Sequence, residues 1–450
     1  MIRQAIAFYC IALTMSGFFV QEPALCQVPL SFSLKQAQDY AYENNYDLKN
    51  SRFDVEIARK MVKQNTSIGF PQINAGADYS DYLQLATWLI PGEFINQPGK
   101  EIPIQFGSKY NFTFRATASQ IIYSGQYLVG LRTAKAFLET SRQKMMKDQM
   151  DVRDLVTDAY ITFLIIQENV RILDSTYITV SQMVKEAKEI LRNGLIEDID
   201  VDQLELNQSN LEATLMNIKN QRLVAYNYLK FVMGLNENQQ IVLTDNLNYF
   251  LSSLGYDALM SQSFDYNRNI DYKLLKKQQY MALMQYKLSK TSYHPTLTAF
   301  IGFNENAQRN SWNFFQAYQP WYMTSSWGLS LTIPIWSSGI RKYSVDQARL
   351  NVEKMKVLDA KTKVALSLQL ETQRNEFNNY YRVFLNKQKG LETARKIYDK
   401  TVAKYRQGIS SSTDLNQKYN QFLDSESEYI QSLMDLLKSR IKFSKLLEQV

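Results

Sequence analysis

The sequence predicts an elongated α+β membrane protein that contains two copies of one unit, each made of a helix, a β-hairpin and a long helical hairpin. Apolar residues between Val152 and Leu191 recur with the 3.5-residue period of a coiled-coil seam, without an internal proline. The seam recurs at an offset of 214 residues, from Leu366 to Tyr405, which indicates an internal duplication. Alternating segments of about ten residues, the length of a strand that crosses a bilayer, precede both seams.

The first seam belongs to a helix that we expect to extend back to about Tyr127. At a rise of 1.5 Å per residue this helix is roughly 100 Å long, which exceeds the depth of an ordinary globular core. It therefore needs a partner helix along its length. The seam residues are Val152, Val156, Ala159, Phe163, Ile166, Val170, Leu173, Tyr177, Val180, Val184, Ala187 and Leu191 in the first copy, and Leu366, Leu370, Phe377, Tyr380, Phe384, Leu391, Ala394, Tyr398 and Tyr405 in the second.

Residues 1–26 are expected to be a secretory signal. Arg3 supplies its positive start, a long apolar stretch begins at Ala5, and the mature chain would begin near Gln27. Cys26 could instead be lipidated, but the residue before it is larger than a lipoprotein site normally has. Both cysteines of the chain lie in this segment, so we expect no disulfide and no thiol chemistry in the mature domain.

Residues 27–235 form the first predicted repeat. Its second strand has the clearest pattern, because aromatic residues from Tyr110 alternate with polar residues from Asn111. In chain order the predicted elements are a helix at 31–44 that Ser33 caps, a helix from 46 to about 67, a strand pair within about 72–122 that is separated by a loop at 83–107, and a coiled-coil hairpin at about 127–234 with its tip at 195–200.

A polar connector at 236–258 leads to the second predicted repeat at 259–450. Residues 45–71 match residues 269–295 at an offset of 224 without a gap. From Gly125, which matches Gly339, the offset is 214, so the change of ten falls in a strand-to-strand loop, where length changes are tolerated. The second strand pair is expected at about 296–335 and the second coiled-coil hairpin at about 340–450.

Composition excludes several classes of function. The net charge is +7, but lysine and arginine are scattered among acidic residues without a basic run, so we expect no nucleic-acid partner. The single histidine, His294, stands just before a strand, where it is far more often a packing residue than a metal ligand or a base. The sequence has no phosphate-binding loop and no hydrolase or metalloprotease motif, so neither an enzyme nor a cofactor is predicted.

Four strands of bilayer length cannot close a barrel alone, and open strand edges are not tolerated in hydrocarbon. The chain must therefore pool its strands with copies of itself, and two copies give eight strands whereas three give twelve. The polar faces of the strands would line a lumen and the apolar faces would meet lipid. Both helical hairpins leave their strands in the same direction, so the assembled hairpins would continue the barrel as a helical tube.

With these features the chain resembles the TolC-like outer-membrane efflux proteins over essentially its whole mature length. The resemblance implies a homotrimer in which a 12-stranded β-barrel in outer-membrane lipid continues as a 12-helix tunnel through the periplasm. It also implies docking to a periplasmic membrane-fusion adaptor and to an inner-membrane pump or ABC transporter, as in tripartite efflux or type I secretion. The resemblance depends on the doubled layout, on Pro71 and Pro295 before the strands, on Ile333-Pro334-Ile335-Trp336 with Gly339 after the fourth strand, and on the tips Leu191-Arg192-Asn193-Gly194 and Tyr405-Arg406-Gln407-Gly408.

The resemblance further implies that acidic rings and salt bridges near the tips close the tunnel. Asp414 matches the first aspartate of that pattern, whereas the second position holds Gln417. Three copies of Asp200 and Asp414 could crowd the narrow end and attract cations, or these residues could simply cap the returning helices. The candidate gate residues of the first tip are Glu197, Asp198, Asp200 and Asp202.

The tip glycines Gly194 and Gly408, with Arg192 and Arg406, resemble the motif that adaptors contact. The structural alternative is a left-handed helix C-cap with a cation beside the helix C-terminus, and both roles are compatible.

A different class of function also fits part of the pattern, namely a periplasmic coiled-coil adaptor or scaffold with a soluble β domain. Adaptors of this kind usually carry one helical hairpin, whereas this sequence carries two full repeats with strands of bilayer length. We therefore favour the outer-membrane channel.

Overall fold

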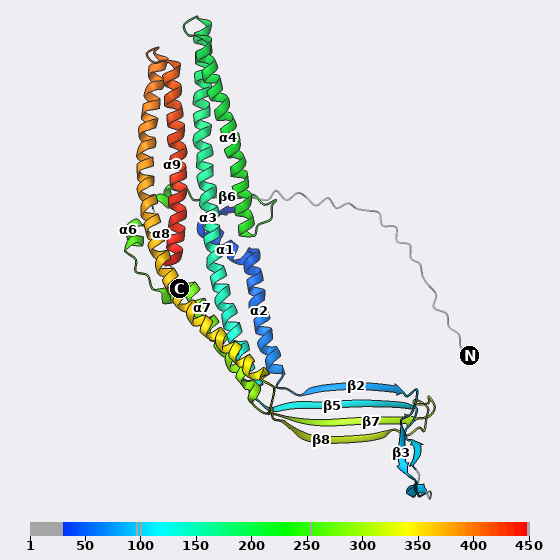
Figure 1. Ribbon diagram of the computed structural model, residues 1–450. Helices are drawn as coiled ribbons and strands as arrows, with labels where there is room; N and C mark the ends of the chain where they lie inside the picture. The colour runs from blue at the N-terminus through cyan, green and yellow to red at the C-terminus, as the bar shows by residue number, and fades with distance from the viewer. Residues whose placement is uncertain (1–29, 96–97, 100, 253, 448–450) are drawn as a thin grey trace, which may run out of the picture.

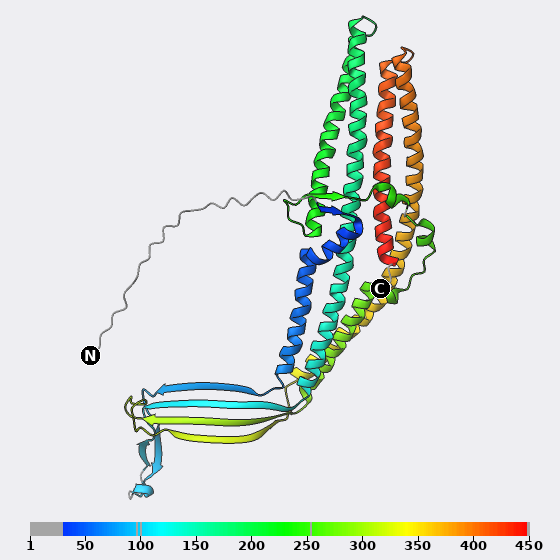
Figure 2. The same cartoon turned by 180° about the vertical axis from the view of Figure 1, so that it is seen from behind.

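The structure is a computed structural model that describes residues 30–95, 98–99, 101–252 and 254–447. The predicted signal segment at 1–26, including Cys26, lies outside these residues. Two helical hairpins stand side by side at one end of the molecule, and a sheet extends from the opposite end of the helices (Figure 1). The same arrangement is seen from behind in Figure 2.

The two hairpins have nearly the same dimensions, as a duplication requires. In the first, α3 (Gly125–Arg192, 68 residues) turns into α4 (Asp198–Met233, 36 residues). In the second, α8 (Ile340–Arg406, 67 residues) turns into α9 (Ser412–Leu447, 36 residues). Each long helix is therefore about 100 Å long, as predicted.

The predicted seams are confirmed as the faces that the hairpins bury. In α3, nine of the seam residues are buried, and Ile166, Tyr177 and Leu191 are partly buried. Residues of both hairpins share one hydrophobic cluster near the tips, where Leu173 and Met183 of α3 meet Tyr398 of α8 and Phe422 of α9. The hairpins are therefore packed against each other and not only within themselves.

Shorter helices extend each hairpin toward the sheet. Both α2 (Tyr46–Ser67) and α7 (Ile270–Lys290) pack on the first half of α3, and α7 also packs on α8. Asn45 and Asn269 cap α2 and α7 in the same way, since each amide oxygen accepts two backbone N–H groups at 2.9 to 3.2 Å. Equivalent caps at an offset of 224 support the duplication read from the sequence.

The first helix, α1 (Leu34–Asn44), carries the predicted cap at Ser33 as a complete capping box with Gln36. The expectation that this helix starts at Ser31 is wrong, because Leu30–Phe32 forms strand β1. β1 pairs in parallel with β6 (Ile241–Leu243) from the connector. The connector also contains α5 (Leu247–Ser252), while α6 (Tyr256–Ser261) crosses the predicted boundary at 258 into the second repeat, and a 3-10 turn at Tyr266–Arg268 follows.

A buried tyrosine holds this small sheet against the long helix. The hydroxyl of Tyr160 in α3 lies 3.0 Å from the carbonyl oxygen of Phe32 and 3.2 Å from the carboxylate of Asp245, and these two acceptors share its single proton. The same carboxylate accepts the backbone N–H of Leu34 at 2.7 Å. Burial raises the pKa of Tyr160, so the hydroxyl keeps its proton and acts as a donor.

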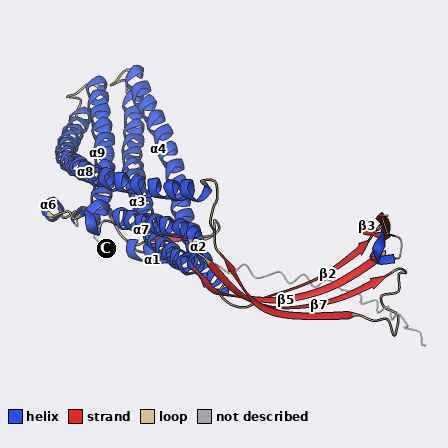
Figure 3. Ribbon diagram, turned by 60° about the horizontal axis from the view of Figure 1, so that its bottom comes forward, coloured by secondary structure: helices blue, strands red, loops and turns tan. Residues whose placement is uncertain are grey.

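The main sheet has the antiparallel order β2-β5-β7-β8 and joins the strand pairs of both repeats (Figure 1). Figure 3 shows β2, β5 and β7 side by side in this sheet. Its strands are β2 (Gln72–Asp81), β5 (Tyr110–Ser124), β7 (Thr296–Arg309) and β8 (Tyr322–Thr332). β7 extends six residues beyond Phe303, where its apolar alternation ends. The predicted loop at 83–107 is not irregular throughout, because it holds a hairpin of β3 (Thr87–Pro91) and β4 (Glu101–Gln105) with a 3-10 turn at Gly92–Ile95.

Candidate functional site

The register of the main sheet gives it one polar and one apolar face. Across the four strands Asp78, Thr113, Asn306 and Tyr322 are paired neighbours, and the residues two positions along each strand continue that face with asparagine, glutamine, serine, threonine, glycine and the charged Arg115. The other face carries Ile73, Ala77, Phe114, Ile301, Trp327, Leu329 and Leu331. Such a sheet suits water on one side and lipid on the other.

The two outer strands of this sheet are open. Within the described residues, β2 pairs only with β5 and β8 pairs only with β7. Unpaired backbone groups in hydrocarbon cost several kcal/mol each, so both edges need partner strands in a membrane.

At the opposite end of the molecule, the predicted tip residues form two similar turns. Gly194 and Gly408 both have a φ of +72°, so each ends its long helix with a left-handed residue that favours glycine. Their arginines differ. Arg192 pairs with Glu189 one turn back on its own helix at 2.6 Å, whereas Arg406 of α8 reaches Glu186 of α3 at 3.1 Å.

Asp200 and Asp414 are not helix N-caps, so the alternative that they cap the returning helices is wrong. α4 begins at Asp198 and α9 at Ser412, which makes each aspartate the third residue of its helix. In the second tip Ser411 is the residue whose hydroxyl accepts the N–H of Asp414, at 3.2 Å. A carboxylate in the first turn still interacts favourably with the helix dipole.

The structure brings Asp200 to the other hairpin but keeps Asp414 within its own. The carboxylate of Asp200 accepts a hydrogen bond from the hydroxyl of Ser412. The carboxylate of Asp414 accepts the hydroxyl of Ser410 at 2.7 Å. Burial, together with the negative charge of Asp200, raises the pKa of Tyr405 on α8.

The remaining candidate gate residues lie at the surface of the tips. Glu197 precedes α4 without a side-chain cap bond, and the carboxylate of Asp198 accepts the adjacent N–H of Ile199 at 2.9 Å. Asp202 and Gln417 are exposed on the returning helices.

Glu186 and Ser412 were missed from the sequence. The duplication gave no signal for either, because the counterpart of Glu186 at offset 214 is Lys400, of opposite charge, and that of Ser412 is Asp198. Contacts between the hairpins therefore break the repeat symmetry that revealed the tips.

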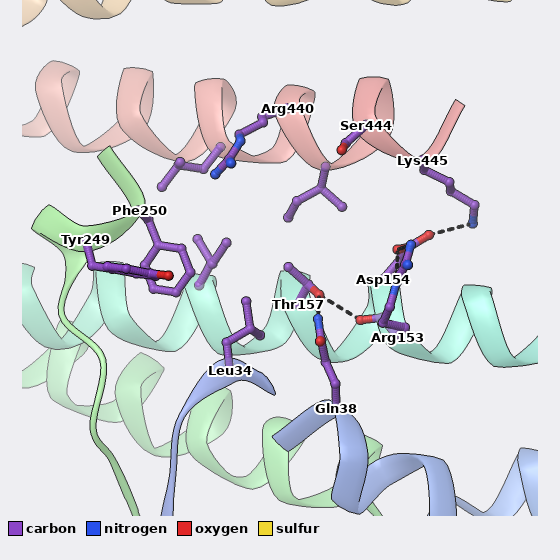
Figure 4. A pocket seen from close by; sticks show the side chains of 13 residues that line it. Leu34, Gln38, Arg153, Asp154, Thr157, Tyr249, Phe250, Arg440, Ser444 and Lys445 are labelled. Atoms are coloured by element: carbon purple, nitrogen blue, oxygen red, sulfur yellow. Dashed lines mark hydrogen bonds and ion pairs between the residues drawn. The ribbon is translucent and has the colours of Figure 1, made fainter. Parts of the chain in front are cut away.

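A pocket of about 430 Å³ lies where α1, α3, α5 and α9 meet (Figure 4). Five of its polar side chains pair with one another, since Gln38 donates to the hydroxyl of Thr157 at 2.8 Å, and Asp154 lies 2.9 Å from Arg153 and 3.4 Å from Lys445. These contacts join the first repeat to α9, and they do not assemble a catalytic acid, base and nucleophile.

Two features are absent from the described part of the chain. There, no group of three or more histidine, cysteine, aspartate or glutamate side chains could hold a metal ion. Among the same residues, none of the helices combines the length and apolar character needed to cross a bilayer.

The two-faced open sheet and the long helical hairpins define the class, a channel-forming protein of the outer membrane. Residues 38–235 and 268–448 match the family described as "Outer membrane efflux protein", and the chain belongs to that family. It is thus an outer-membrane efflux channel with a helical extension into the periplasm, not a periplasmic adaptor. No curated protein sequence matches the chain.

Solved structures share this fold at low sequence identity. CusC, whose crystal structures are described in terms of folding and transmembrane channel formation, superposes with a TM-score of 0.70 and 13% identity, over 93% of this chain and 92% of CusC. The CmeC outer membrane channel of Campylobacter jejuni gives 0.69 and 16%, over 92% and 85%. The MtrE outer membrane channel of Neisseria gonorrhoeae gives 0.67 and 14%, over 92% and 88%. The predicted fold class is confirmed.

Proposed function

We propose that three copies of this chain close their sheets into one 12-stranded barrel and their hairpins into one 12-helix tunnel. The observation that carries this proposal is the four-stranded sheet with one polar face, one apolar face and two open edges. Pairing β2 of one copy with β8 of the next satisfies both edges in a ring. The channel is passive, catalyses no reaction and gives exit to substrates that an inner-membrane transporter drives.

The tips are the docking ends of this tunnel. The tips of the two hairpins stand farthest from the sheet (Figure 1). The tip residues Gly194, Gly408, Arg192 and Arg406 are exposed, where a periplasmic membrane-fusion adaptor and an inner-membrane pump or ABC transporter would meet them. The mature domain has no cysteine, so a single cysteine at Ser411 or Ile196 allows clean crosslinking in cells. Capture of an adaptor or transporter supports docking, whereas crosslinks only to other copies of the chain contradict it.

A substitution pair on β8 tests the assembly. Leu329 lies on the apolar face, and lysine there should cost about 2 to 4 kcal/mol near the bilayer midplane and abolish insertion. Ser326 lies on the polar face, so S326K should insert, form heat-sensitive trimers on gels and shift conductance in planar bilayers toward anions. A chain that stays monomeric, or one in which L329K inserts and conducts normally, would refute the proposal.

We also propose that Asp200 and Asp414 set the cation preference of the closed end. Three copies place six carboxylates near the tips, and like charges at a constriction attract cations. The double substitution D200N/D414N should lower cation over anion selectivity in bilayers, while E212Q, which alters an exposed carboxylate farther along α4, should leave it nearly unchanged. Unchanged selectivity in the double variant would leave these carboxylates a structural role only.

A further inference from the structure

The loop between β7 and β8, residues 310–321, has an unusual composition for a segment at the outer end of a membrane protein. Five of its twelve residues are aromatic and none is charged. Loops that face water are normally polar and charged, whereas tryptophan and tyrosine concentrate at membrane interfaces. The composition therefore points to a surrounding that is not simply water.

This segment, which we call the aromatic loop, folds back over the apolar face of the sheet. The ring of Phe314 is 1% exposed and lies 6.1 Å from the ring of Tyr79 and 5.7 Å from that of Phe112. Both partners belong to the apolar face, as does the fully buried Ala307. The loop thus lies on the side of the sheet that faces lipid and not on the lumen side.

A buried arginine fixes the loop in this position. Arg309, the last residue of β7, donates to the carbonyl of Pro320 at the far end of the loop and to that of Gln308 at 2.9 Å. The ring of Trp321 packs 5.7 Å from that of Phe112. The loop is therefore tied at both ends to the sheet.

The outer surface of the aromatic loop exposes three aromatic rings in the single chain, next to uncharged polar side chains such as that of Gln316. Trp312 is 62% exposed and Phe315 is 74% exposed. Tyr318 is fully exposed and has a φ of +69°, a left-handed conformation that costs roughly 1 kcal/mol for a residue other than glycine. The fold therefore tolerates backbone strain and exposed apolar area where it presents these rings outward.

The position of the loop matches the outer boundary of a bilayer. On β8 the apolar face runs from Leu331 to Met323, which spans about 26 Å along the strand and somewhat less along the membrane normal. The exposed rings of Tyr293, Trp336 and Tyr343 mark the periplasmic end of this band, and the aromatic loop begins where the band ends on the other side. It continues the lipid-facing surface.

We propose that the aromatic loop is a membrane anchor that lies in outer-leaflet lipid, with Trp312, Phe315 and Tyr318 at the boundary between acyl chains and headgroups. Rings with an apolar body and a polar edge are stabilised at this depth. The inference rests on the proposed channel only in taking the apolar face of the sheet as the one that meets lipid. A neighbouring copy or an external protein are the other possible occupants, and the experiment distinguishes both from lipid.

Tryptophan fluorescence in reconstituted channels tests the anchor. The chain has five tryptophans, so two variants are made that keep only Trp312 or only Trp327, with phenylalanine at the others. In vesicles of phosphatidylcholine brominated near the headgroup end of the acyl chains, Trp312 should be quenched at least about twofold more than in vesicles brominated near the bilayer centre. Trp327, in the middle of the apolar face, should show the opposite preference.

The two tryptophans separate failure of the anchor from failure of the channel. Quenching of Trp327 without quenching of Trp312 would refute the anchor and leave the channel intact, and it would indicate that protein or water covers the loop. Absence of quenching at both positions would refute the lipid-facing assignment itself. If the background with four phenylalanines does not assemble, W312F in the native chain should reduce the quenched fraction for headgroup-end bromines, and an unchanged fraction refutes the anchor.

Discussion

Glu426 of α9 should make the stability of the helical tunnel depend on pH. It stands on the buried stripe of α9 between Phe422 and Ile430 and is 2% exposed. Within the described residues neither of its carboxylate oxygens has a hydrogen-bond partner. Burial raises its pKa to about 7, and the positive charge of Arg395 on α8 offsets only part of that effect.

The size and sign of the effect follow from linkage. In the unfolded chain Glu426 ionises near the ordinary value of 4.5, whereas in the fold it stays protonated up to about 7. Between these values the folded state binds more protons, so stability falls as the pH rises from about 4.5 to 7 and is constant on either side. The difference between these two pKa values corresponds to about 3 kcal/mol of unfolding free energy per chain.

The substitution E426Q removes ionisation and preserves shape. At pH 8 it should raise the midpoint of thermal unfolding of the purified channel, and at pH 4 it should change the midpoint little. Glu428, two residues along the helix, is exposed and paired with Lys387 at 2.7 Å, so E428Q is the matched control and should not alter the pH dependence. If E426Q and the native channel lose stability equally between pH 4 and 8, Glu426 is not the group whose ionisation causes the pH dependence.

Three further predictions, two of them with a control variant, concern other contacts. The Arg406 pair joins the hairpins across exposed surface, so R406A should raise the ratio of open to closed channels by no more than about fivefold, equivalent to at most about 1 kcal/mol. R192A breaks a pair within one helix and should not change this ratio. Y160F removes the hydroxyl that bonds the end of β1 and a nearby carboxylate, and chemical denaturation should show a loss of about 1 to 3 kcal/mol. In G234A the new Cβ would lie 2.4 Å from a backbone oxygen at the α1–α2 junction at a φ of +76°, so its midpoint of thermal unfolding should fall. By contrast, G390A, in open space on α8, should gain about 1 kcal/mol of stability from helix propensity, and equal effects in the two glycine variants would contradict this explanation.

The long elements could be predicted from the sequence because their signals are local and repeated. A 3.5-residue period sustained over forty residues from Val152 fixes a helix and its buried side together. The three-residue pairing of β1 with β6 joins segments about 210 residues apart and has no periodic signal. The outer part of β7 was missed for a different reason, because Glu305 interrupts its apolar alternation near the outer end, where the aromatic loop covers part of the same face.

The tips show the same division between local and long-range information. The turns at Gly194 and Gly408 were found because each is a local helix-ending pattern present twice. The partner of Arg406 could not be found in this way, since the ion pair joins α8 to α3 and depends on how the hairpins pack. The packing of the hairpins therefore decides which carboxylate contacts the other hairpin. Asp200 makes such a contact, whereas Asp414 does not.

The two returning helices show how the duplicated halves became different. Glu212 of α4 is the counterpart of Glu426 at offset 214, yet Glu212 is exposed and Glu426 is buried. The difference arises because α9 packs against α8 and also against α3 and α4 of the first hairpin, whereas α4 leaves apolar residues such as Met216, Leu223 and Val224 exposed. Apolar side chains exposed in this number on one helix indicate a partner that covers them. In the proposed trimer that partner is the neighbouring copy. The next chain would then bury the apolar residues of α4, as the first hairpin of the same chain already does for α9.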